Sequence, residues 1–356
     1  MSVLRGPVLV VGTGLLGTSI ALACRRAGLD VLLSDVAAEH LRTARGLGAG
    51  RLVAAGDAPQ LVVVAVPPDH LGASVVEALS ATDAVVTDVG SVKTRPLRQV
   101  AAVVGPELLT RYVGSHPMAG SERSGPLAAT AALFDGRPWA VVPHATSDPA
   151  ATALVTALAE LCGAAVVRLS PEEHDQAVAR TSHLPHLMSV LMAGQLDGAP
   201  REHLALSGQG VRDVTRVAGS DPAMWQQIVA ANAEALLAQL DQVRTRLDDL
   251  IGAIADGRRD DLEALLDRGV AGTQAIPGKH GGPARATASV FVSLPDHPGE
   301  LARLFADAGA SEVNIEDVHI DHDPARDTGL VELLVAEASA EHLTTSLESR
   351  GWMTHR

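Results

Sequence analysis

Short apolar runs alternate with helical patterns through the first half of the chain. The run at 7–11 ends at a glycine, which is typical of a buried strand, and an apolar helical pattern follows from about Leu15 to Ala27. Strand and helix alternating in this way predict a parallel sheet with right-handed crossovers. The remaining predicted strands are 31–34, 61–66, 84–87 and 112–115, with 139–142 and 165–168 closing the same sheet.

The pattern changes after Pro171. Helical periodicity runs from 171 to about 270, and a proline in its first turn starts one long helix over 221–254. Glycine and proline then dominate 271–286, which is typical of a linker. A compact unit with a βαββαβ pattern begins at Thr287, with strands at 288–294, 314–320 and 330–335 and helices at 299–308 and from Ala340.

Composition narrows the functional classes. The net charge of −14 argues against a nucleic-acid partner, which would require a basic face. Cys24 and Cys162 each lie in an apolar helical pattern and are expected to be buried thiols in a reducing cytosol. No signal peptide or membrane-spanning run is recognised, so we expect a cytoplasmic protein without a membrane partner.

A dinucleotide fingerprint joins the first strand to the first helix. Gly12-Thr13-Gly14-Leu15-Leu16-Gly17 is G-x-G-x-x-G, in which Gly12 permits a tight turn, Gly14 lets the backbone approach a pyrophosphate, and Gly17 packs the helix on the strand. The helix N-terminus then favours the anion, and Leu15 and Leu16 begin that helix. This context predicts a Rossmann-type α/β domain over 1–170.

Asp35 ends the second strand, eighteen residues after Gly17. Its carboxylate is placed to accept from a ribose 2′-hydroxyl and would repel a 2′-phosphate. The following Val36-Ala37-Ala38 offers no arginine to bind such a phosphate. NAD is therefore expected rather than NADP.

A loop at 114–125 contains a titratable imidazole, several hydroxyls and flexible glycines: Gly-Ser-His-Pro-Met-Ala-Gly-Ser-Glu-Arg-Ser-Gly. Taken alone, His116 would be a structural histidine. The loop nevertheless resembles the catalytic loop of prephenate dehydrogenases, and so do Ser182-His183-Leu184-Pro185-His186 and Arg212-Asp213-Val214-Thr215-Arg216, in the family's order. His183 and His186 are spaced as H-x-x-H at an expected helix start, but nothing completes a metal site.

The resemblance implies a role for each matching residue. His116 takes the proton of the substrate's ring hydroxyl as hydride leaves for the nicotinamide, and Ser91 lies beside both. Arg216 binds the substrate carboxylate, while Arg212 stands where a family member has lysine. The structural alternative for Ser91 is a helix N-cap, and the structural alternative for Glu122 is a surface carboxylate. The implied substrate contacts are Ser182, His186, Arg212, Arg216 and Glu122.

The resemblance extends to both later regions. It implies a helical substrate and dimerisation domain over 171–272 and a linker at 273–286. The sequence Leu294-Pro295-Asp296-His297-Pro298-Gly299-Glu300-Leu301, followed by Val313-Asn314-Ile315, resembles an ACT domain, which is expected over 287–356. Trp225 resembles a tryptophan that reaches the neighbouring subunit's pocket, although a core position is equally compatible. The ACT match implies a tyrosine-binding regulatory site, or alternatively a ligand-free assembly module. Its expected residues are Asp296, Pro298, Gly299, Asn314 and Ile315.

The expected activity is NAD-dependent oxidative decarboxylation of prephenate to 4-hydroxyphenylpyruvate by a homodimer. Arogenate, the amino analogue that yields tyrosine directly, is the alternative substrate. A β-hydroxyacid dehydrogenase would need a lysine base on a long helix, and no lysine occurs between Lys93 and Lys279. An amino-acid-binding regulator with an inactive dinucleotide domain is the non-enzyme alternative, and the intact His116 and Arg216 count against it.

Overall fold

The computed structural model describes residues 3–119, 124–276, 286–295, 297–322 and 328–355. Two compact units divide the chain between Leu266 and Asp267. The first contains both the dinucleotide fingerprint and the helical region, and the second contains the C-terminal sheet. In the described part of the chain, no helix is long and apolar enough to cross a membrane.

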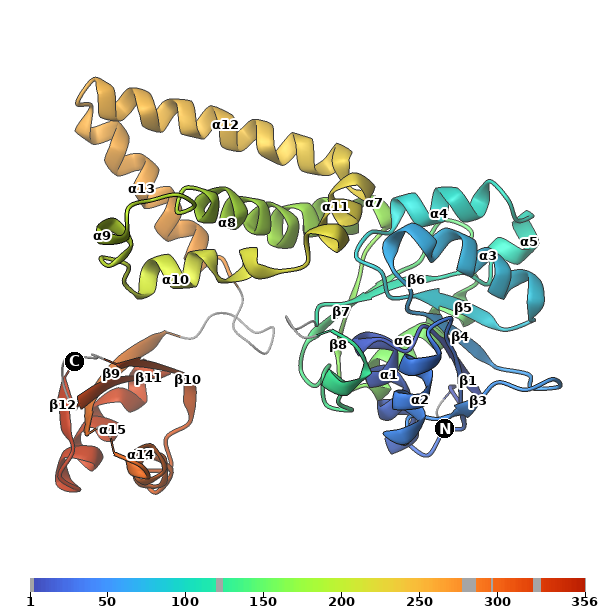
Figure 1. Cartoon of the computed structure of the whole chain (residues 1–356), viewed down its shortest axis with the longest axis horizontal. Coiled ribbons are helices and arrows are strands. Elements are labelled where there is room, and N and C mark those ends of the chain that lie inside the picture. Colours follow the sequence, from blue (N-terminus) through green and yellow to red (C-terminus); the bar gives the residue numbers. More distant parts are fainter. Residues whose placement is uncertain (1–2, 120–123, 277–285, 296, 323–327, 356) are drawn as a thin grey trace. The chain divides into compact units, whose positions relative to one another are not determined.

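A five-stranded sheet in the order β3-β2-β1-β4-β5 forms the centre of the first unit, and every pair in it is parallel, as predicted. Its first three helices connect consecutive strands, and α4 follows β5 (Figure 1). The bounds are β1 (Val8–Val11), α1 (Leu15–Arg26), β2 (Val31–Ser34), α2 (Ala38–Gly46), β3 (Arg51–Leu52), β4 (Leu61–Val64), η1 (Pro68–His70), α3 (Leu71–Ala81), β5 (Val85–Asp88), α4 (Thr94–Ala101) and α5 (Pro106–Leu109).

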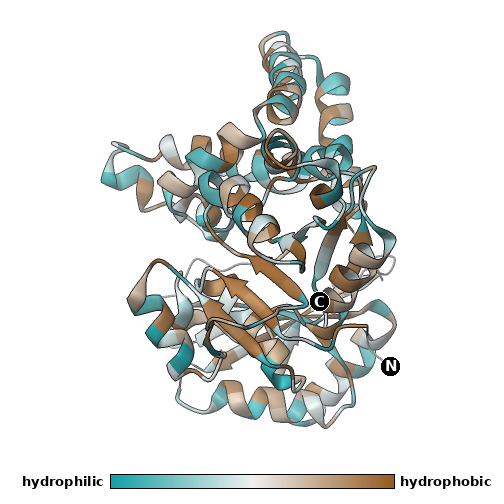
Figure 2. Ribbon diagram, turned by 90° about the vertical axis from the view of Figure 1, so that its right-hand side faces the viewer, coloured by the Kyte–Doolittle hydropathy of each residue, from teal (hydrophilic) through white to brown (hydrophobic). Residues whose placement is uncertain are grey.

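Alternation along β4 explains why helices cover both faces of this sheet. Leu61 and Val63 pack with residues of α1, whereas Val62 and Val64 pack with residues of α3 and α4. Successive side chains on a strand point to opposite faces, so a strand buried on both sides must be apolar throughout. Figure 2 shows strands that are mostly hydrophobic and helices that also carry hydrophilic stretches.

A three-stranded sheet continues beyond β5 and corrects one prediction. It contains β6 (Gly114–Pro117), β7 (Pro138–Val142) and β8 (Ala165–Arg168). A bridge between Val86 and Tyr112, two residues before β6, pairs the chain with β5. The prediction that 139–142 and 165–168 close the same parallel sheet is wrong, because β6 and β7 are antiparallel. Parallel neighbours need a crossover, which α6 (Pro149–Leu161) supplies between β7 and β8. Between β6 and β7 the described residues hold only the short turn η2 (Pro126–Ala128).

The predicted strand at 112–115 lies two residues too early, because the observed strand is Gly114–Pro117. Tyr112 and Val113 are buried beside β5, where the N–H of Val113 donates to the carbonyl of Val86, whereas the polar His116 lies within β6 rather than after it.

Helices make up the rest of the first unit, and the last helix, Arg259–Gln274, continues past the boundary at Leu266. Helix α7 begins with a capping box between Ser170 and Glu173 and passes through a π-helical turn directly into α8. The helix start predicted near His183 is confirmed, because His183 is the N-cap of α8, although the chain enters α8 from a π-helical turn rather than from a loop. The bounds are α7 (Pro171–Val178), η3 (Ala179–His183), α8 (Leu184–Gly194), α9 (Arg201–Leu204), α10 (Gln209–Thr215), η4 (Arg216–Gly219), α11 (Pro222–Ala231), α12 (Ala233–Ala255) and α13 (Arg259–Gln274).

Asn232 interrupts the long helix predicted over 221–254. Its backbone leaves the helical region at φ −116° and ψ 29°, and its side chain donates to the carbonyl of Asp175 at 2.8 Å. Helix α13 also continues to Gln274, so the linker predicted at 271–286 begins later than its composition indicated. Residues 277–285 of that linker lie outside the described residues.

The C-terminal unit has the predicted βαββαβ order. Its antiparallel sheet is ordered β10-β11-β9-β12, and buried residues such as Val290, Val292 and Leu343 form a core separate from the first unit's. The bounds are β9 (Thr287–Pro295), α14 (Glu300–Gly309), β10 (Ile315–His322), β11 (Thr328–Ala336), α15 (Glu337–Ser349) and β12 (Met353–His355).

Candidate active site

The glycine loop is shaped by close backbone contacts. A Cβ atom on Gly17 would lie 1.9 Å from the carbonyl oxygen of Gly12, and one on Gly12 would lie 2.4 Å from that of Ala65. Gly12 also has φ +94°, a region that favours glycine. A Cβ on Gly14, by contrast, would meet nothing within 4 Å. Gly12 and Gly17 are thus required by packing, while Gly14 faces open space.

The N-terminus of α1 suits an anion. Gly14 is its N-cap and supplies no capping side chain, and the first turn, which includes Leu15 and Leu16, holds no acidic residue. The N–H groups of this turn and the helix dipole therefore face the open side of the loop without a carboxylate to satisfy them. These features fit a dinucleotide pyrophosphate.

Asp35 closes the loop from the end of β2. Its carboxylate accepts from the backbone N–H of Thr13, from the Thr13 hydroxyl at 2.7 Å and from the N–H of Ala37 at 2.7 Å. Burial alone would raise the pKa of Asp35, but these hydrogen bonds outweigh it and hold the pKa below its ordinary value. The carboxylate is therefore ionised and fixed beside the glycine loop.

His116 projects from β6 onto the start of α7. Its Nδ1 atom lies 3.0 Å from Nε2 of His174, whose own Nδ1 lies 2.9 Å from Oδ1 of Asp175. Burial, together with the charges of His174, Lys93 and His183, lowers the pKa of His116 well below 6.5. The ring is consequently neutral at pH 7 and can act as a base.

The carboxylate of Asp175 also accepts from the backbone N–H groups of Lys93 at 2.8 Å and Thr94 at 2.9 Å. Burial would raise the pKa of Asp175, but its hydrogen bonds from His174 and these N–H groups hold the pKa below its ordinary value. His174 and Asp175 were missed in the sequence. The signal that could have found them is Ser170-Pro171-Glu172-Glu173, a helix start that places both in the following turn.

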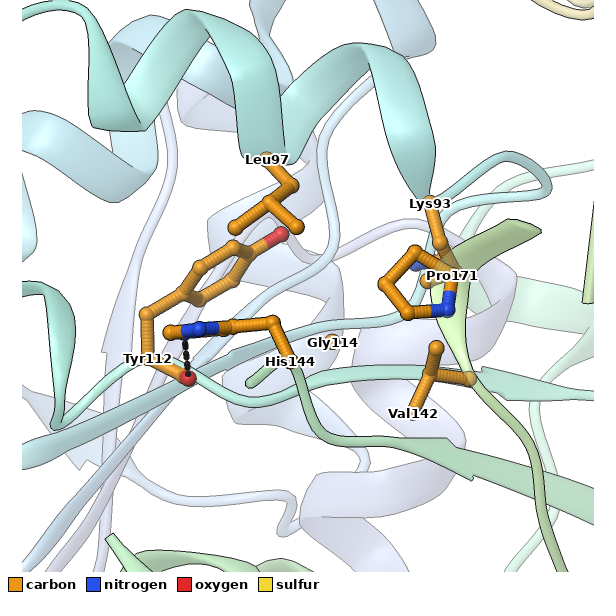
Figure 3. Close-up of a pocket in the computed structure, with 7 residues that line it drawn as sticks. All are labelled: Lys93, Leu97, Tyr112, Gly114, Val142, His144 and Pro171. Atoms are coloured by element: carbon orange, nitrogen blue, oxygen red, sulfur yellow. Dashed lines mark hydrogen bonds between the residues drawn. The ribbon is translucent and has the colours of Figure 1, made fainter. Parts of the chain in front are cut away.

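A buried ion pair between Lys93 and Asp88 packs against β6. The Lys93 ammonium group contacts the carboxylate of Asp88 and donates to the carbonyl of Ser115 at 2.7 Å. The Tyr112 hydroxyl donates to the same carboxylate at 2.7 Å. This pair ties the end of β5 to the residue preceding His116. The small cavity beside it in Figure 3, about 10 Å³, holds no more than a single water and is lined by Lys93, Leu97, Tyr112, Gly114, Val142, His144 and Pro171.

Ser91 is half-buried on the loop between β5 and α4. The alternative that it caps the following helix is wrong, because the N-cap of α4 is Lys93. That loop leads directly into Lys93, which contacts Ser115 and Asp175. Ser91 is thus free of a capping role, and it lies two residues before Lys93.

The histidines of the helical region are buried around Trp225. The ring of His186 stacks on Trp225 at 3.4 Å between centroids, and His183 meets the same indole edge-on. Asn232 lies 3.2 Å from Nδ1 of His183. Burial lowers the pKa of His183 to about 4 and also lowers that of His186. Ser182, by contrast, is exposed.

Arg212 and Arg216 are exposed and lie four residues apart on adjoining helical turns, α10 and η4. That spacing puts them on one face, and both turns pack against α8, which carries His186. Neither arginine forms an ion pair with another described residue. Glu122 lies outside the described residues, and the described part of the chain holds no cluster of metal-ligating side chains.

An anion-binding glycine loop, a fixed acidic residue after β2 and a neutral histidine near the carboxyl edge of the sheet define a dinucleotide-dependent oxidoreductase. Family comparison agrees. Residues 20–168 match the nucleotide-binding domain of prephenate dehydrogenase, and residues 170–268 match its dimerization domain. The chain belongs to the prephenate dehydrogenase family.

Relatives cover most of the chain. It is 37% identical over 358 residues to the probable prephenate dehydrogenase NovF of Streptomyces niveus, with 96% of this chain and 98% of that protein aligned. The crystal structure of A. aeolicus prephenate dehydrogenase with hydroxyphenyl propionate and NAD⁺ is 28% identical with a TM-score of 0.68, covering 76% of this chain and 98% of that one. Synechocystis arogenate dehydrogenase is 27% identical with a TM-score of 0.64, covering 75% and 98%.

The buried histidines predict acid-sensitive stability. In the unfolded chain His183 binds a proton near pH 6.5, whereas in the folded chain it does so only near pH 4, so stability is lost as the pH falls through this window. For His183 alone the loss is about 2 kcal/mol between about pH 7.5 and pH 5. Urea unfolding of the wild type and of His183→Gln at both pH values measures it. An identical pH dependence in the two proteins would contradict the assignment.

Proposed function

We propose that this protein catalyses the NAD-dependent oxidative decarboxylation of prephenate to 4-hydroxyphenylpyruvate, a step of tyrosine biosynthesis. The observation that carries the proposal is the neutral His116, held in β6 by His174 and Asp175 on the family's loop. A neutral imidazole is the base that this reaction requires near pH 7.

NAD is the cofactor that these residues fit. The N-terminus of α1 would hold the pyrophosphate. Asp35 keeps one lone pair on Oδ1 for a ribose hydroxyl, because Oδ2 accepts twice from Thr13 and Oδ1 accepts once from Ala37. Val36 is fully exposed beside Asp35, and the two alanines that follow it offer no cation for a 2′-phosphate. When bound, NAD⁺ accepts the hydride that leaves carbon 4 of the substrate ring.

His116 is the general base that accepts the proton of the ring hydroxyl in this reaction. Nδ1 is occupied by His174, so Nε2 is the atom that accepts the proton of the ring hydroxyl as the hydride departs. The ring carboxylate then leaves as carbon dioxide, and the electrons of the broken C–C bond restore the aromatic ring. The oxygen at carbon 4 recovers its proton from His116, and the resulting phenol makes the step effectively irreversible. Ser91 is assigned to orient His116 against the substrate.

Cationic and hydrogen-bonding groups are needed for the substrate's two carboxylates. Arg216 is exposed and has no ion-pair partner among the described residues, so its guanidinium is available for a bidentate contact, with Arg212 beside it. We assign Ser182, His186 and Glu122 to the remaining contacts on the basis of the matching motifs. His186 would act as a neutral donor, because burial lowers its pKa.

Arogenate is the second candidate substrate, because a structural relative is an arogenate dehydrogenase. The two compounds differ only in a keto or amino group on the side chain. The proposed roles of His116 and Arg216 are the same for both.

Replacing His116 tests the function directly. His116→Asn should lower turnover by roughly 10²–10⁴, the usual contribution of general acid–base catalysis, while the KM for prephenate changes little. Steady-state kinetics measure both quantities. His203→Asn, on the exposed face of α9, is the matched control and should retain wild-type turnover. Wild-type turnover in His116→Asn would remove this residue from the chemistry.

We also propose a homodimer formed through the helical region. Leu247, Ile251 and Ile254 lie at helical spacing on α12 and are all more than half exposed, as are Leu266 and Val270 on α13. Apolar residues spaced in this way form a stripe that is stable only when it is covered. The family match of this region is to a dimerization domain.

The C-terminal unit is proposed to be an ACT domain that senses tyrosine. Its βαββαβ order fits, and Gly299 forms the N-cap of α14 in the left-handed region, at φ +98°, with no capping side chain. Backbone N–H groups at such a helix start suit an amino-acid carboxylate. Pro298 precedes this cap, and Asn314 precedes Ile315, the first residue of β10; Asp296 lies outside the described residues.

Truncation after Gln274 separates assembly from regulation. The shortened chain should remain an active dimer, because the described catalytic residues and the apolar stripe of α12 precede the cut. Calorimetric titration of the full-length protein with tyrosine, phenylalanine and tryptophan should show tyrosine binding that the truncated protein lacks, apart from competition at the active site. If both proteins bind tyrosine equally and are equally inhibited, the unit is an assembly module.

A further inference from the structure

A line of hydrogen bonds leads from His116 into the first turns of α7. His116 Nδ1 faces His174 Nε2 at 3.0 Å, and His174 Nδ1 faces the Asp175 carboxylate at 2.9 Å. The two imidazoles meet edge to face, with an interplanar angle of 64°, so that nitrogen points to nitrogen. His174 is completely buried, so water cannot replace either contact from outside.

Asp175 determines which ring nitrogen of His174 and of His116 carries the proton. An ionised carboxylate only accepts hydrogen bonds, and two backbone N–H groups, of Lys93 and Thr94, already donate to this one. His174 must therefore carry its proton on Nδ1, which leaves a lone pair on Nε2. That lone pair in turn requires a donor, so the proton of neutral His116 lies on Nδ1. The lone pair of His116 is then on Nε2.

We propose that His174 and Asp175 are positioning residues for His116, which fix its tautomer and its ring orientation so that Nε2 presents a lone pair to the substrate hydroxyl. The inference rests on the proposed function for its catalytic meaning. In serine proteases an aspartate orients the catalytic histidine directly. Here Asp175 would orient His116 in the same way, with the ring of His174 between them.

The same line stabilises the charge that forms during the reaction. When His116 accepts a proton, its Nδ1–H still donates to His174, and the negative charge of Asp175 lies one ring away. The nearest lysine, Lys93, is already paired with Asp88. Asp175 therefore provides the anion that faces the new imidazolium through His174.

Asp175→Leu is the primary test, because it removes the acceptor that holds the proton of His174 on Nδ1. Oδ1 of Asp175 accepts both from His174 and from the backbone N–H of Lys93, so an asparagine would keep its carbonyl oxygen there and leave the protons in place. Leucine instead lets the protons of His174 and His116 occupy either ring nitrogen. We expect kcat for prephenate to fall by at least about tenfold, and by no more than the roughly 10⁴-fold loss of the base itself, while KM stays within about threefold. Glu172→Gln is the control, since it removes the same charge from an exposed position of the same helix.

Two replacements of His174 keep the test valid if Asp175→Leu does not fold. His174→Phe keeps a ring at the site but removes both nitrogens, whereas the amide oxygen of His174→Gln can still accept from His116 Nδ1. We expect kcat to fall at least about tenfold in the phenylalanine variant, and the glutamine variant to recover part of that loss. Equal kcat in both variants and the wild type would overturn the proposal.

A spectroscopic readout separates this proposal from the proposed function. In full-length protein labelled with ¹⁵N-histidine, the ring signals that disappear in His116→Gln belong to His116. We expect the proton on Nδ1 in the wild type and signals of both tautomers in Asp175→Leu. A proton that remains on Nδ1 alone in that variant, or a loss of activity through KM alone, overturns the positioning role. Absence of any prephenate oxidation by the wild type would defeat the proposed function, and the tautomer measurement would still decide the role of Asp175.

Discussion

The carboxylate of Asp175 joins three segments that are distant in the sequence. It accepts from the backbone at the start of α4, it holds the ring of His174 on α7, and through that ring it reaches His116 on β6. The backbone carbonyl of Asp175 accepts a hydrogen bond from the side chain of Asn232, at the break between α11 and α12. The position of the proposed base relative to the helical region therefore depends on one buried anion. Removing one partner from such a buried charged network costs about 3–5 kcal/mol, because the remaining charge loses its compensation.

A second buried pair performs the same task within the nucleotide-binding region. Lys93 and Asp88 are fully buried, and with Tyr112 they connect the end of β5 to the first residues of β6. Lys93 also donates its backbone N–H to Asp175, so the two networks share a residue. In the proposed function, the exposed pair Arg212 and Arg216 would supply the local positive charge that a dianionic substrate needs on a chain with a net charge of −14.

Much of this fold could be predicted where local pattern and tertiary environment agree. The strand Val31–Ser34 was predicted with its observed bounds, and Leu61–Val64 lies within its predicted range, because strands buried on both faces are apolar throughout. The antiparallel β6 could not be predicted, since Ser115 and His116 break the apolar pattern and the described residues between β6 and β7 form no crossover α-helix. Asn232 was read as helix interior because its bonds to Asp175 and His183 exist only in the folded chain. His174 and Asp175 were missed for the same reason, because their partners lie more than fifty residues away.

The most direct measurement is the steady-state rate of nicotinamide reduction by the full-length protein with prephenate and with arogenate, each supplied with NAD and with NADP. The highest kcat/KM should belong to prephenate with NAD, and NADP should be poorer by at least about tenfold, about 1.4 kcal/mol of transition-state binding, because Asp35 repels its 2′-phosphate. No reduction with either ring substrate, a preference for arogenate, or equal use of NADP would contradict the account.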